Sequence, residues 1–356
     1  MSFPIDIDKF VNLNFTLGDG LSNQERDDLT KNIGLMRDAI VATTAVARAK
    51  GIGGHTGGPY DIVPEVIIID ALRDGGAPIH DEFFDEAGHR SALQYVRGAI
   101  RGKLDPEKLM HYREYGSGLA GHPEAELLDC IDFSTGRLGH AAGHVNGVAM
   151  ANPGKAVIMF GSDGAQMEGN DAEAARLAVA NNLNVKWVID DNNVTIAGHP
   201  ENYMSGFDVG KTLEGHGFKV FSCDGENYTE VHGAITSSLK VNGPAAVICK
   251  RVMGPGIPDL EGTSKLHDVI PFDTGIDYLK ERGHTKAVEV LEKIAAEQST
   301  IPPADFKGSG EKGACRKQFG VSVANILRGM SAEERKRVHA FDSDLEGSVG
   351  LTSIRE

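Results

Sequence analysis

The 356-residue sequence contains few cysteines, and none of them forms a recognisable motif. Cys130, Cys223, Cys249 and Cys315 stand far apart and lack the paired spacing of a zinc site or a redox motif. The N-terminus also lacks the basic start and apolar core of a signal peptide. The simplest interpretation is a reduced, cytoplasmic protein.

Positive charge and long apolar runs are scarce as well. The chain has 36 lysine and arginine residues against 51 aspartate and glutamate residues, which gives a formal net charge of −15. Surfaces that bind nucleic acid are basic, so this composition argues against a nucleic-acid partner. No apolar stretch is long enough to cross a bilayer, and we therefore expect no membrane-spanning segment.

Short apolar runs alternate with segments that have helical periodicity. Two helices are predicted, one over residues 27–50 and one over residues 63–72 with Pro64 in its first turn. Four buried strands are predicted over residues 156–160, 185–189, 218–222 and 245–249. This alternation predicts an α/β fold with a mostly parallel sheet and helices on both faces.

The most informative stretch is A-V-I-M-F-G-S-D-G-A-Q-M-E-G, residues 156–169. Its apolar run predicts a buried strand that ends at Gly161, before a helix over residues 170–182. Gly161 and Gly164 allow a tight turn where a phosphate can approach the helix that follows. Asp163, between them, offers the hard carboxylate oxygen that Mg²⁺ prefers.

A second polar cluster, D-D-N-N-V in residues 190–194, follows the next predicted strand. Ligands of parallel α/β sheets bind at the carboxyl ends of the strands, where this cluster and Asp163 are expected to meet. The Asp163 carboxylate, the Asn192 amide oxygen and the Val194 carbonyl fit the oxygen ligands that Mg²⁺ takes beside substrate phosphates. Two ordinary turns would also be rich in Gly, Asp and Asn, but the pairing of both clusters favours a magnesium and diphosphate site.

In these two motifs the chain resembles the thiamine diphosphate enzymes, and in detail the transketolase family. Asp163, Gly164 and Asn192 match the positions that hold the cation and diphosphate, although Ser162 replaces the first glycine of the family's Gly-Asp-Gly. Glu168 matches a glutamate of the proton-relay network at the family's dimer interface. The resemblance implies thiamine diphosphate with Mg²⁺, or with Ca²⁺ or Mn²⁺ in its place.

Four histidines extend the resemblance, in the order and approximate spacing that transketolases use. In the family these histidines surround the reactive thiazolium carbon, bind sugar hydroxyls and reach the diphosphate, and imidazole suits these tasks because it both donates and accepts hydrogen bonds. Any one of them, taken singly, is more often a structural turn residue. They are His55 in G-G-H-T-G-G-P, His89 in E-A-G-H-R-S, His122 in A-G-H-P-E and His267 in S-K-L-H-D.

The motif F-S-T-G-R-L-G-H resembles the family loop that wraps the aminopyrimidine and diphosphate. Gly136, Leu138 and Gly139 match, whereas Arg137 replaces a proline and His140 a glutamine. His140 and His144 are additional histidines that are interpreted as structural residues, with contact to the substrate as the alternative. The H-P-E match at residues 122–124 favours transketolase over the first component of the 2-oxoacid dehydrogenases. The loop of residues 250–258 is expected to return His267 to the site, although its Gly and Pro content suits any surface loop.

We expect three regions along the chain: a diphosphate-binding domain over residues 1–300, a linker over 301–313 and the start of a pyrimidine-binding domain over 314–356. A strand of that second domain is expected within residues 338–351. Arg316 matches a family arginine that grips the substrate phosphate, although a solvated arginine at a helix start is the alternative without the resemblance.

The resemblance implies transfer of a two-carbon ketol unit from a ketose phosphate to an aldose. The catalytic glutamate and aromatic platform of the family's pyrimidine-binding domain have no counterpart in these residues. We therefore expect the N-terminal half of an enzyme, working as a homodimer or hetero-oligomer with a chain that carries the pyrimidine-binding domain, or with a missing C-terminal part. The alternatives are a 2-oxoacid dehydrogenase first component and a non-catalytic module for cofactor binding or assembly.

Overall fold

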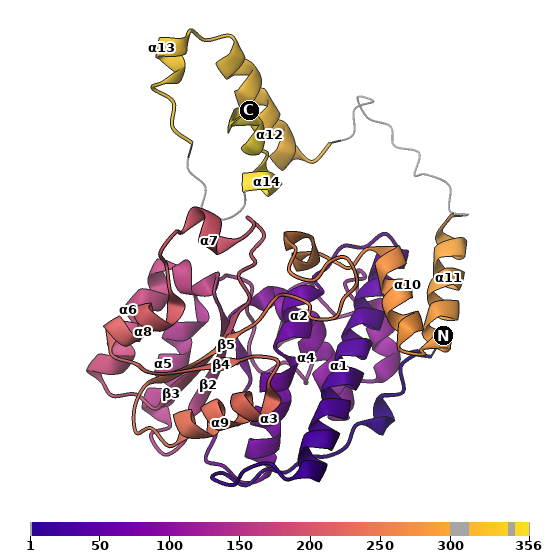
Figure 1. The fold of residues 1–356 in the computed structure, drawn as a ribbon. Helices are drawn as coiled ribbons and strands as arrows, with labels where there is room; N and C mark the ends of the chain where they lie inside the picture. The colour runs from indigo at the N-terminus through magenta and orange to yellow at the C-terminus, as the bar shows by residue number, and fades with distance from the viewer. Residues whose placement is uncertain (1, 300–312, 341–345, 356) are drawn as a thin grey trace.

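The computed structural model describes residues 2–299, 313–340 and 346–355, and its centre is a parallel β-sheet (Figure 1). The strand order is β1-β2-β3-β5-β4, and each neighbouring pair is parallel. The strands are β1 (Phe84–Asp85), β2 (Val157–Ser162), β3 (Val185–Asp191), β4 (Lys219–Asp224) and β5 (Ala245–Lys250). The predicted strands and their parallel arrangement are confirmed, and each runs one or two residues further toward its carboxyl end.

Helices cover both faces of the sheet, as Figure 1 shows. One face packs against α5 (Ala141–Ala151), α6 (Gly169–Ala180) and α8 (Val209–His216). The other packs against α3 (Val63–Asp74) and α9 (Tyr228–Leu239), with α1 (Asn23–Ala49), α4 (Ser91–Ile100), α10 (Phe272–Glu281) and α11 (Thr285–Ser299) completing that core. Shorter pieces connect these elements: α2 (Gly57–Asp61), α7 (Pro200–Tyr203), and the 3₁₀ turns Ile7–Lys9, Gly88–Arg90, Pro106–His111, Ala165–Met167 and Ser264–His267.

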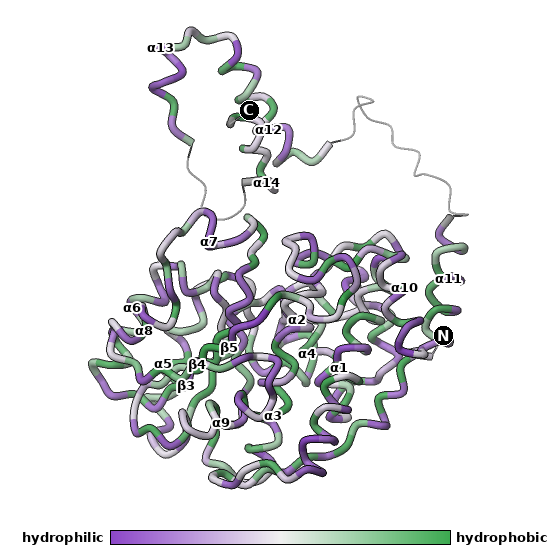
Figure 2. Tube along the Cα trace, viewed as in Figure 1, coloured by the Kyte–Doolittle hydropathy of each residue, from purple (hydrophilic) through white to green (hydrophobic). Residues whose placement is uncertain are grey.

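Alternate side chains of each strand serve the two cores. Ile158 and Phe160 pack on the α3 side, whereas Val157 and Met159 pack on the α5 side, as the two-residue period of a strand requires. Figure 2 shows the central strands as hydrophobic segments between the helical layers. Lys186 is an exception, because it is fully buried and its Nζ donates to the carbonyls of Val241 and Gly243.

The first long helix begins earlier than predicted because of its N-terminal cap. Ser22 and Glu25 form a capping box: the Ser22 Oγ accepts from the Glu25 N–H at 3.3 Å, and Glu25 accepts from the Ser22 N–H at 2.7 Å. This cap starts α1 at Asn23 rather than at residue 27. No helix among the described residues is both long and apolar enough to span a bilayer.

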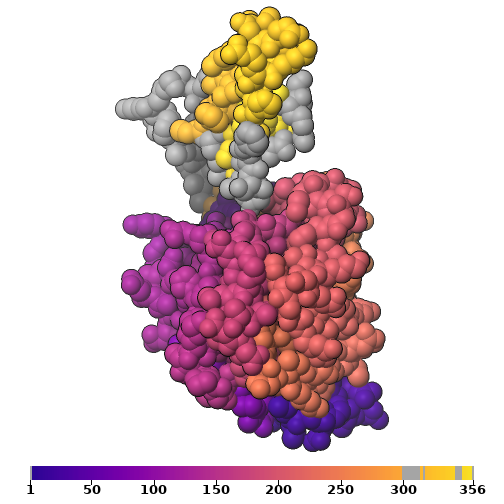
Figure 3. Space-filling model, turned by 90° about the vertical axis from the view of Figure 1, so that its left-hand side faces the viewer, coloured from indigo at the N-terminus to yellow at the C-terminus, as the bar shows by residue number. Residues whose placement is uncertain are grey.

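The described C-terminal residues are helical and project beyond one end of the main body (Figures 1 and 3). They form α12 (Cys315–Arg328), α13 (Ala332–Arg335), α14 (Glu346–Val349) and α15 (Thr352–Arg355). The strand expected within residues 338–351 is wrong over the described part, where residues 338–340 are irregular and α14 follows at residues 346–349. An isolated strand is not stable without a neighbouring strand to pair with, and the described strands all belong to the central sheet. Residues 301–312 of the predicted linker and the side chain of Arg316 lie outside the described part.

Candidate functional site

A cavity of about 590 Å³ opens at the carboxyl ends of β2 and β3. Segments far apart in the sequence line it, including Ser348 of α14. Of the predicted site residues whose side chains the structure describes, only Gly139 is not among its lining. The cavity brings together His55, His89, His122, Gly136, Leu138, Asp163, Gly164, Glu168, Asn192, Val194 and His267. This proximity agrees with the sequence analysis, while the role of each residue stays a prediction.

Asp163 lies directly after β2, where the sheet register fixes its position. Its N–H donates to the Asp190 carbonyl at 3.0 Å, which ties the ends of β2 and β3 together. Its Oδ1 accepts from the Gly164 N–H at 2.7 Å, but its buried Oδ2 has no hydrogen-bond partner. Burial, followed by the neighbouring charges of Asp190 and Asp191, raises the pKa of the Asp163 carboxyl well above its usual range. Such an oxygen requires a proton or a cation.

Asn192 is held in one orientation by hydrogen bonds on both sides of its amide. Its Oδ1 accepts from the Val194 N–H at 3.0 Å. Its Nδ2 donates to the carboxylates of Asp61 at 2.9 Å and Asp190 at 3.0 Å. The amide oxygen therefore lies on the side of the turn that begins at Asn193, whose φ of 57° is left-handed.

Three of the predicted histidines form a compact triangle. The ring centres of His55 and His89 are 5.1 Å apart, those of His55 and His267 are 5.4 Å apart, and those of His89 and His267 are 4.9 Å apart. Gly58 belongs to this packing, because a Cβ there would lie 3.0 Å from the His89 Nε2. The loop after β5 thus does return His267 to the site, as predicted.

These histidines are neutral near neutral pH. Burial is the largest cause and lowers the pKa of His55 to about 3, with the neighbouring His267 and Arg113 adding to the effect. Burial likewise lowers the pKa values of His89, His122 and His267. A neutral imidazole carries one donor and one acceptor nitrogen, so the triangle can bind hydroxyl groups without placing positive charge in the cavity.

The loop of residues 133–140, which carries Gly136 and Gly139, packs closely against the segments that hold Gly88 and Glu168. A Cβ on Gly88 would lie 2.8 Å from the Gly136 Cα, so these two backbones approach each other directly. Gly139 has a φ of 73°, and a Cβ there would lie 2.2 Å from the Glu168 Cβ. Glu168 precedes α6 and lines the cavity. Gly139 thus allows this close contact and is not among the residues that line the cavity, and its predicted part in cofactor binding stays a prediction.

A buried charge network behind Asn192 was not predicted from the sequence. Arg251 donates to the Glu65 carboxylate and the Asp61 carbonyl, and its Nε lies 3.4 Å from the Asp190 Oδ1. The Arg251 and Glu65 side chains are at most 1% exposed, which leaves no solvent to screen their charges. The available sequence signal was a glutamate inside the apolar run of α3 and an arginine directly after β5.

A second acidic cluster lies between α6 and the β1 side of the sheet. The buried Glu86 carboxyl faces Asp171, and neither of its oxygens has another hydrogen-bond partner. Burial raises the pKa of both carboxyls, that of Asp171 to about 7. The Gln166 Nε2 donates to the other Asp171 oxygen at 2.5 Å. The two carboxyls therefore share a proton, because two ionised carboxylates would repel each other here.

Asp171→Asn should stabilise the chain more at pH 8 than at pH 4. Between about pH 4 and pH 7 the unfolded chain releases the Asp171 proton while the folded chain retains it, so this carboxyl progressively destabilises the folded state as pH rises. The introduced amide can donate to Glu86 and removes that cost. Because each pKa unit corresponds to about 1.4 kcal/mol and the proton is shared, we expect a gain of about 2 kcal/mol at pH 8.

Urea unfolding at both pH values measures this effect. Glu173→Gln, an exposed acid on the same helix, is the matched control and should change stability little at either pH. An equal gain from Asp171→Asn at pH 4 and pH 8 would contradict the shared proton.

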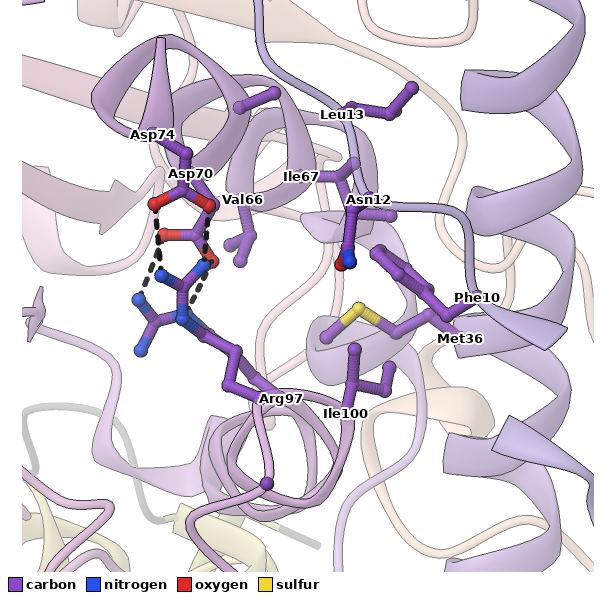
Figure 4. Close-up of a pocket in the computed structure, with 13 residues that line it drawn as sticks. Phe10, Asn12, Leu13, Met36, Val66, Ile67, Asp70, Asp74, Arg97 and Ile100 are labelled. Atoms are coloured by element: carbon purple, nitrogen blue, oxygen red, sulfur yellow. Dashed lines mark hydrogen bonds and ion pairs between the residues drawn. The ribbon is translucent and has the colours of Figure 1, made fainter. Parts of the chain in front are cut away.

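Another cavity, of about 450 Å³, lies beside the carboxyl-terminal ends of α3 and α4 (Figure 4). Arg97 forms two hydrogen bonds with Asp70, at 2.6 and 2.8 Å. Arg101 pairs with Asp74 in the same way, at 3.1 and 3.0 Å. The charges of these arginines and aspartates thus neutralise one another, whereas the cavity at Asp163 contains a carboxylate oxygen for which the described residues offer no hydrogen-bond partner.

Comparison with known proteins gives a consistent result. A sequence model of a protein family, described as transketolase, thiamine diphosphate binding domain, matches residues 35–302. The transketolase of Rhodobacter capsulatus is 31% identical over 266 residues, which cover 68% of this chain and 38% of that protein. A transketolase of Staphylococcus epidermidis is 29% identical over 252 residues, which cover 65% of this chain and 38% of that protein.

Solved structures share the fold. The transketolase of Campylobacter jejuni superposes with a TM-score of 0.62 at 22% identity, covering 85% of this chain and 55% of that one. A transketolase variant of Pichia stipitis in complex with fructose-6-phosphate gives a TM-score of 0.64 at 25% identity, covering 77% of this chain and 44% of that one. The chain thus spans about two fifths of the length of the curated relatives that it matches.

Proposed function

Because the chain belongs to the transketolase family through its thiamine diphosphate binding domain, we propose that it supplies the diphosphate-binding half of a ketol-transferring enzyme. The cavity at the ends of β2 and β3 would hold the cofactor. The observation that carries this proposal is the convergence of Asp163, Asn192 and the three-histidine triangle on that cavity.

The residues fit a divalent cation with oxygen ligands. Among the described residues, no group of three or more His, Cys, Asp or Glu side chains is arranged to hold a metal ion. The proposed Mg²⁺ site does not need such a group, because Mg²⁺ takes few protein ligands and completes its shell with water and phosphate oxygens. The unpartnered Asp163 Oδ2, the Asn192 Oδ1 and the Val194 carbonyl would supply the protein's share, for Mg²⁺ or for Ca²⁺ or Mn²⁺ in its place.

The residues also fit the cofactor. Backbone can approach a ligand closely at Gly136 and Gly164, which both line the cavity. When bound, thiamine diphosphate would supply the carbon nucleophile needed to cleave the ketose carbon–carbon bond next to the carbonyl and to transfer two carbons to an aldose. His55, His89, His122 and His267 would bind hydroxyl groups as neutral donors and acceptors.

A pyrimidine-binding domain from a partner chain, or from polypeptide outside residues 1–356, would bind the aminopyrimidine side of the cofactor. Glu168, beside Gly139, would connect the site to a second subunit, and Arg316 would bind the phosphate of a sugar phosphate. The working enzyme would be a homodimer or a hetero-oligomer with a chain that carries the pyrimidine-binding domain. We propose a cytoplasmic location for it.

Ketol transfer in the presence of a pyrimidine-binding domain tests the proposal. The chain is combined with such a domain, thiamine diphosphate and Mg²⁺, and transfer from a ketose phosphate to an aldose phosphate is followed. Turnover that requires both polypeptides supports the proposal. Pyruvate consumption instead would favour a 2-oxoacid dehydrogenase component. Cofactor binding without turnover, with any complementing domain, would favour a non-catalytic module.

A further inference from the structure

The Asp61 carboxylate joins three segments of the site. It belongs to the last residue of α2, six residues after His55, and is fully buried. Its Oδ1 accepts from the Gly254 N–H at 2.8 Å, in the loop that leads to His267. Its Oδ2 accepts from the Asn192 Nδ2 at 2.9 Å, at the end of β3. Both oxygens are therefore committed to donors from the other two segments.

These hydrogen bonds decide which end of the Asn192 amide is the oxygen. The two ends of an amide have nearly the same shape, so only their hydrogen-bond partners distinguish them. The Asn192 Nδ2 meets two carboxylates, those of Asp61 and Asp190, while its Oδ1 meets the Val194 N–H. A flipped amide would place its oxygen against two carboxylates and its NH₂ group against another N–H donor. The observed orientation is strongly preferred.

We infer that Asp61 is a positioning residue for the proposed cation site, holding the Asn192 amide so that its oxygen is available to the cation. This inference rests on the proposed function. Asp61 does not itself bind the cation: it acts through Asn192. Arg251 fixes the backbone of Asp61 by donating a hydrogen bond to the Asp61 carbonyl. Partners of this kind orient metal ligands, and losing one typically weakens metal affinity about 10- to 100-fold.

Asp61→Asn tests the inference with a change of almost no volume. The introduced amide can present its oxygen to only one of its two donors. If the oxygen of the introduced amide accepts from the Gly254 N–H, its NH₂ group faces the NH₂ group of Asn192. The Asn192 amide must then either tolerate this clash or flip, and flipping turns the Asn192 oxygen away from the cation. We expect the affinity of the full chain for Mn²⁺, in the presence of thiamine diphosphate, to fall about 10-fold or more, measured from the electron paramagnetic resonance signal of free Mn²⁺.

A second variant separates positioning from mere anchoring of the Gly254 loop. In Asp61→Asn/Asn192→Asp the donor and acceptor are exchanged, so the amide at position 61 can donate to a carboxylate at position 192. A carboxylate has two equivalent oxygens and needs no orientation, so the double variant should bind Mn²⁺ more tightly than Asp61→Asn alone. Because the carboxylate at position 192 can itself tighten Mn²⁺ binding, the double variant must also bind Mn²⁺ more tightly than Asn192→Asp alone. If it does not, Asp61 only anchors the loop, and that result overturns the inference.

The control variant and the wild type complete the design. Asp70→Asn removes another carboxylate, from a partly buried ion pair at the 450 Å³ cavity, and should leave Mn²⁺ affinity unchanged. Thermal unfolding confirms that each variant is folded. If Asp61→Asn alone does not fold, the double variant is compared with Asn192→Asp alone, and the double variant should bind Mn²⁺ more tightly than Asn192→Asp. A wild type that binds no Mn²⁺ with cofactor, even when a pyrimidine-binding domain is supplied, overturns the proposed function and the inference together. A wild type that binds, with Asp61→Asn binding equally well, overturns the inference alone.

Discussion

Asp163→Ala should abolish cation-dependent binding of thiamine diphosphate and, at the same time, stabilise the ligand-free chain. Both effects have one cause: the Asp163 Oδ2 is buried without a partner, which is costly unless a proton or a cation satisfies it. In wild type, cofactor and Mg²⁺ at a hundred times the dissociation constant should stabilise the fold by about 2.7 kcal/mol. That corresponds to a rise of roughly 4 °C in the unfolding midpoint for a chain of this size.

Thermal unfolding with and without cofactor, and with and without Mg²⁺, measures both effects. The variant should start from a higher midpoint than wild type and gain nothing from the ligands. Asp224→Asn is the matched control, because Asp224 also lies at the carboxyl end of a strand, β4, and does not line the cavity. A full ligand-induced rise in Asp163→Ala would show that the cation is held elsewhere.

The sheet and the cavity lining were predictable because their signals are local. Each strand is a short apolar run, and each polar cluster comes directly after its strand. Asp163 and Asn192 could therefore be placed at one edge of the sheet from the sequence alone. Gly139 was also identified, although its requirement comes from contact with Glu168 rather than with the cavity. The order of the β4 and β5 strands has no such local signal.

The buried charge network was not predictable because its partners are remote in sequence. Arg251 meets Asp61 and Glu65 across about 190 residues, and nothing near any of the three indicates the others. Charged side chains usually lie at the surface, and a buried one needs a partner. Even the position of Glu65 inside an apolar run does not show which residue that partner is. The proton shared by Glu86 and Asp171 was missed for the same reason. Sequence patterns thus located eleven of the twenty residues that line the cavity, but not those that hold them in place.

Arg251→Met should destabilise the chain by about 3–5 kcal/mol, the usual cost of removing one member of a buried ion pair. Arg251 is the cation that faces the buried carboxylates of Glu65 and Asp190, and without it both are left in a medium that cannot solvate them. Urea unfolding of the variant and wild type without ligands measures the difference. Arg101→Met, at the partly exposed pair with Asp74, should cost about 1 kcal/mol or less.

The cost of Arg251→Met should come from uncompensated charge rather than from lost packing, and two measurements distinguish these causes. Arg251→Met/Glu65→Met removes charge of both signs and should recover part of the lost stability, since an apolar pair often replaces a buried ion pair without loss. Burial already raises the pKa of Glu65, and Arg251 opposes that rise. Without Arg251 the glutamate pKa rises further, so acidic pH should neutralise it and reduce the destabilisation. A cost that is equal at pH 5 and pH 8, and unchanged in the double variant, would instead assign Arg251 a packing role.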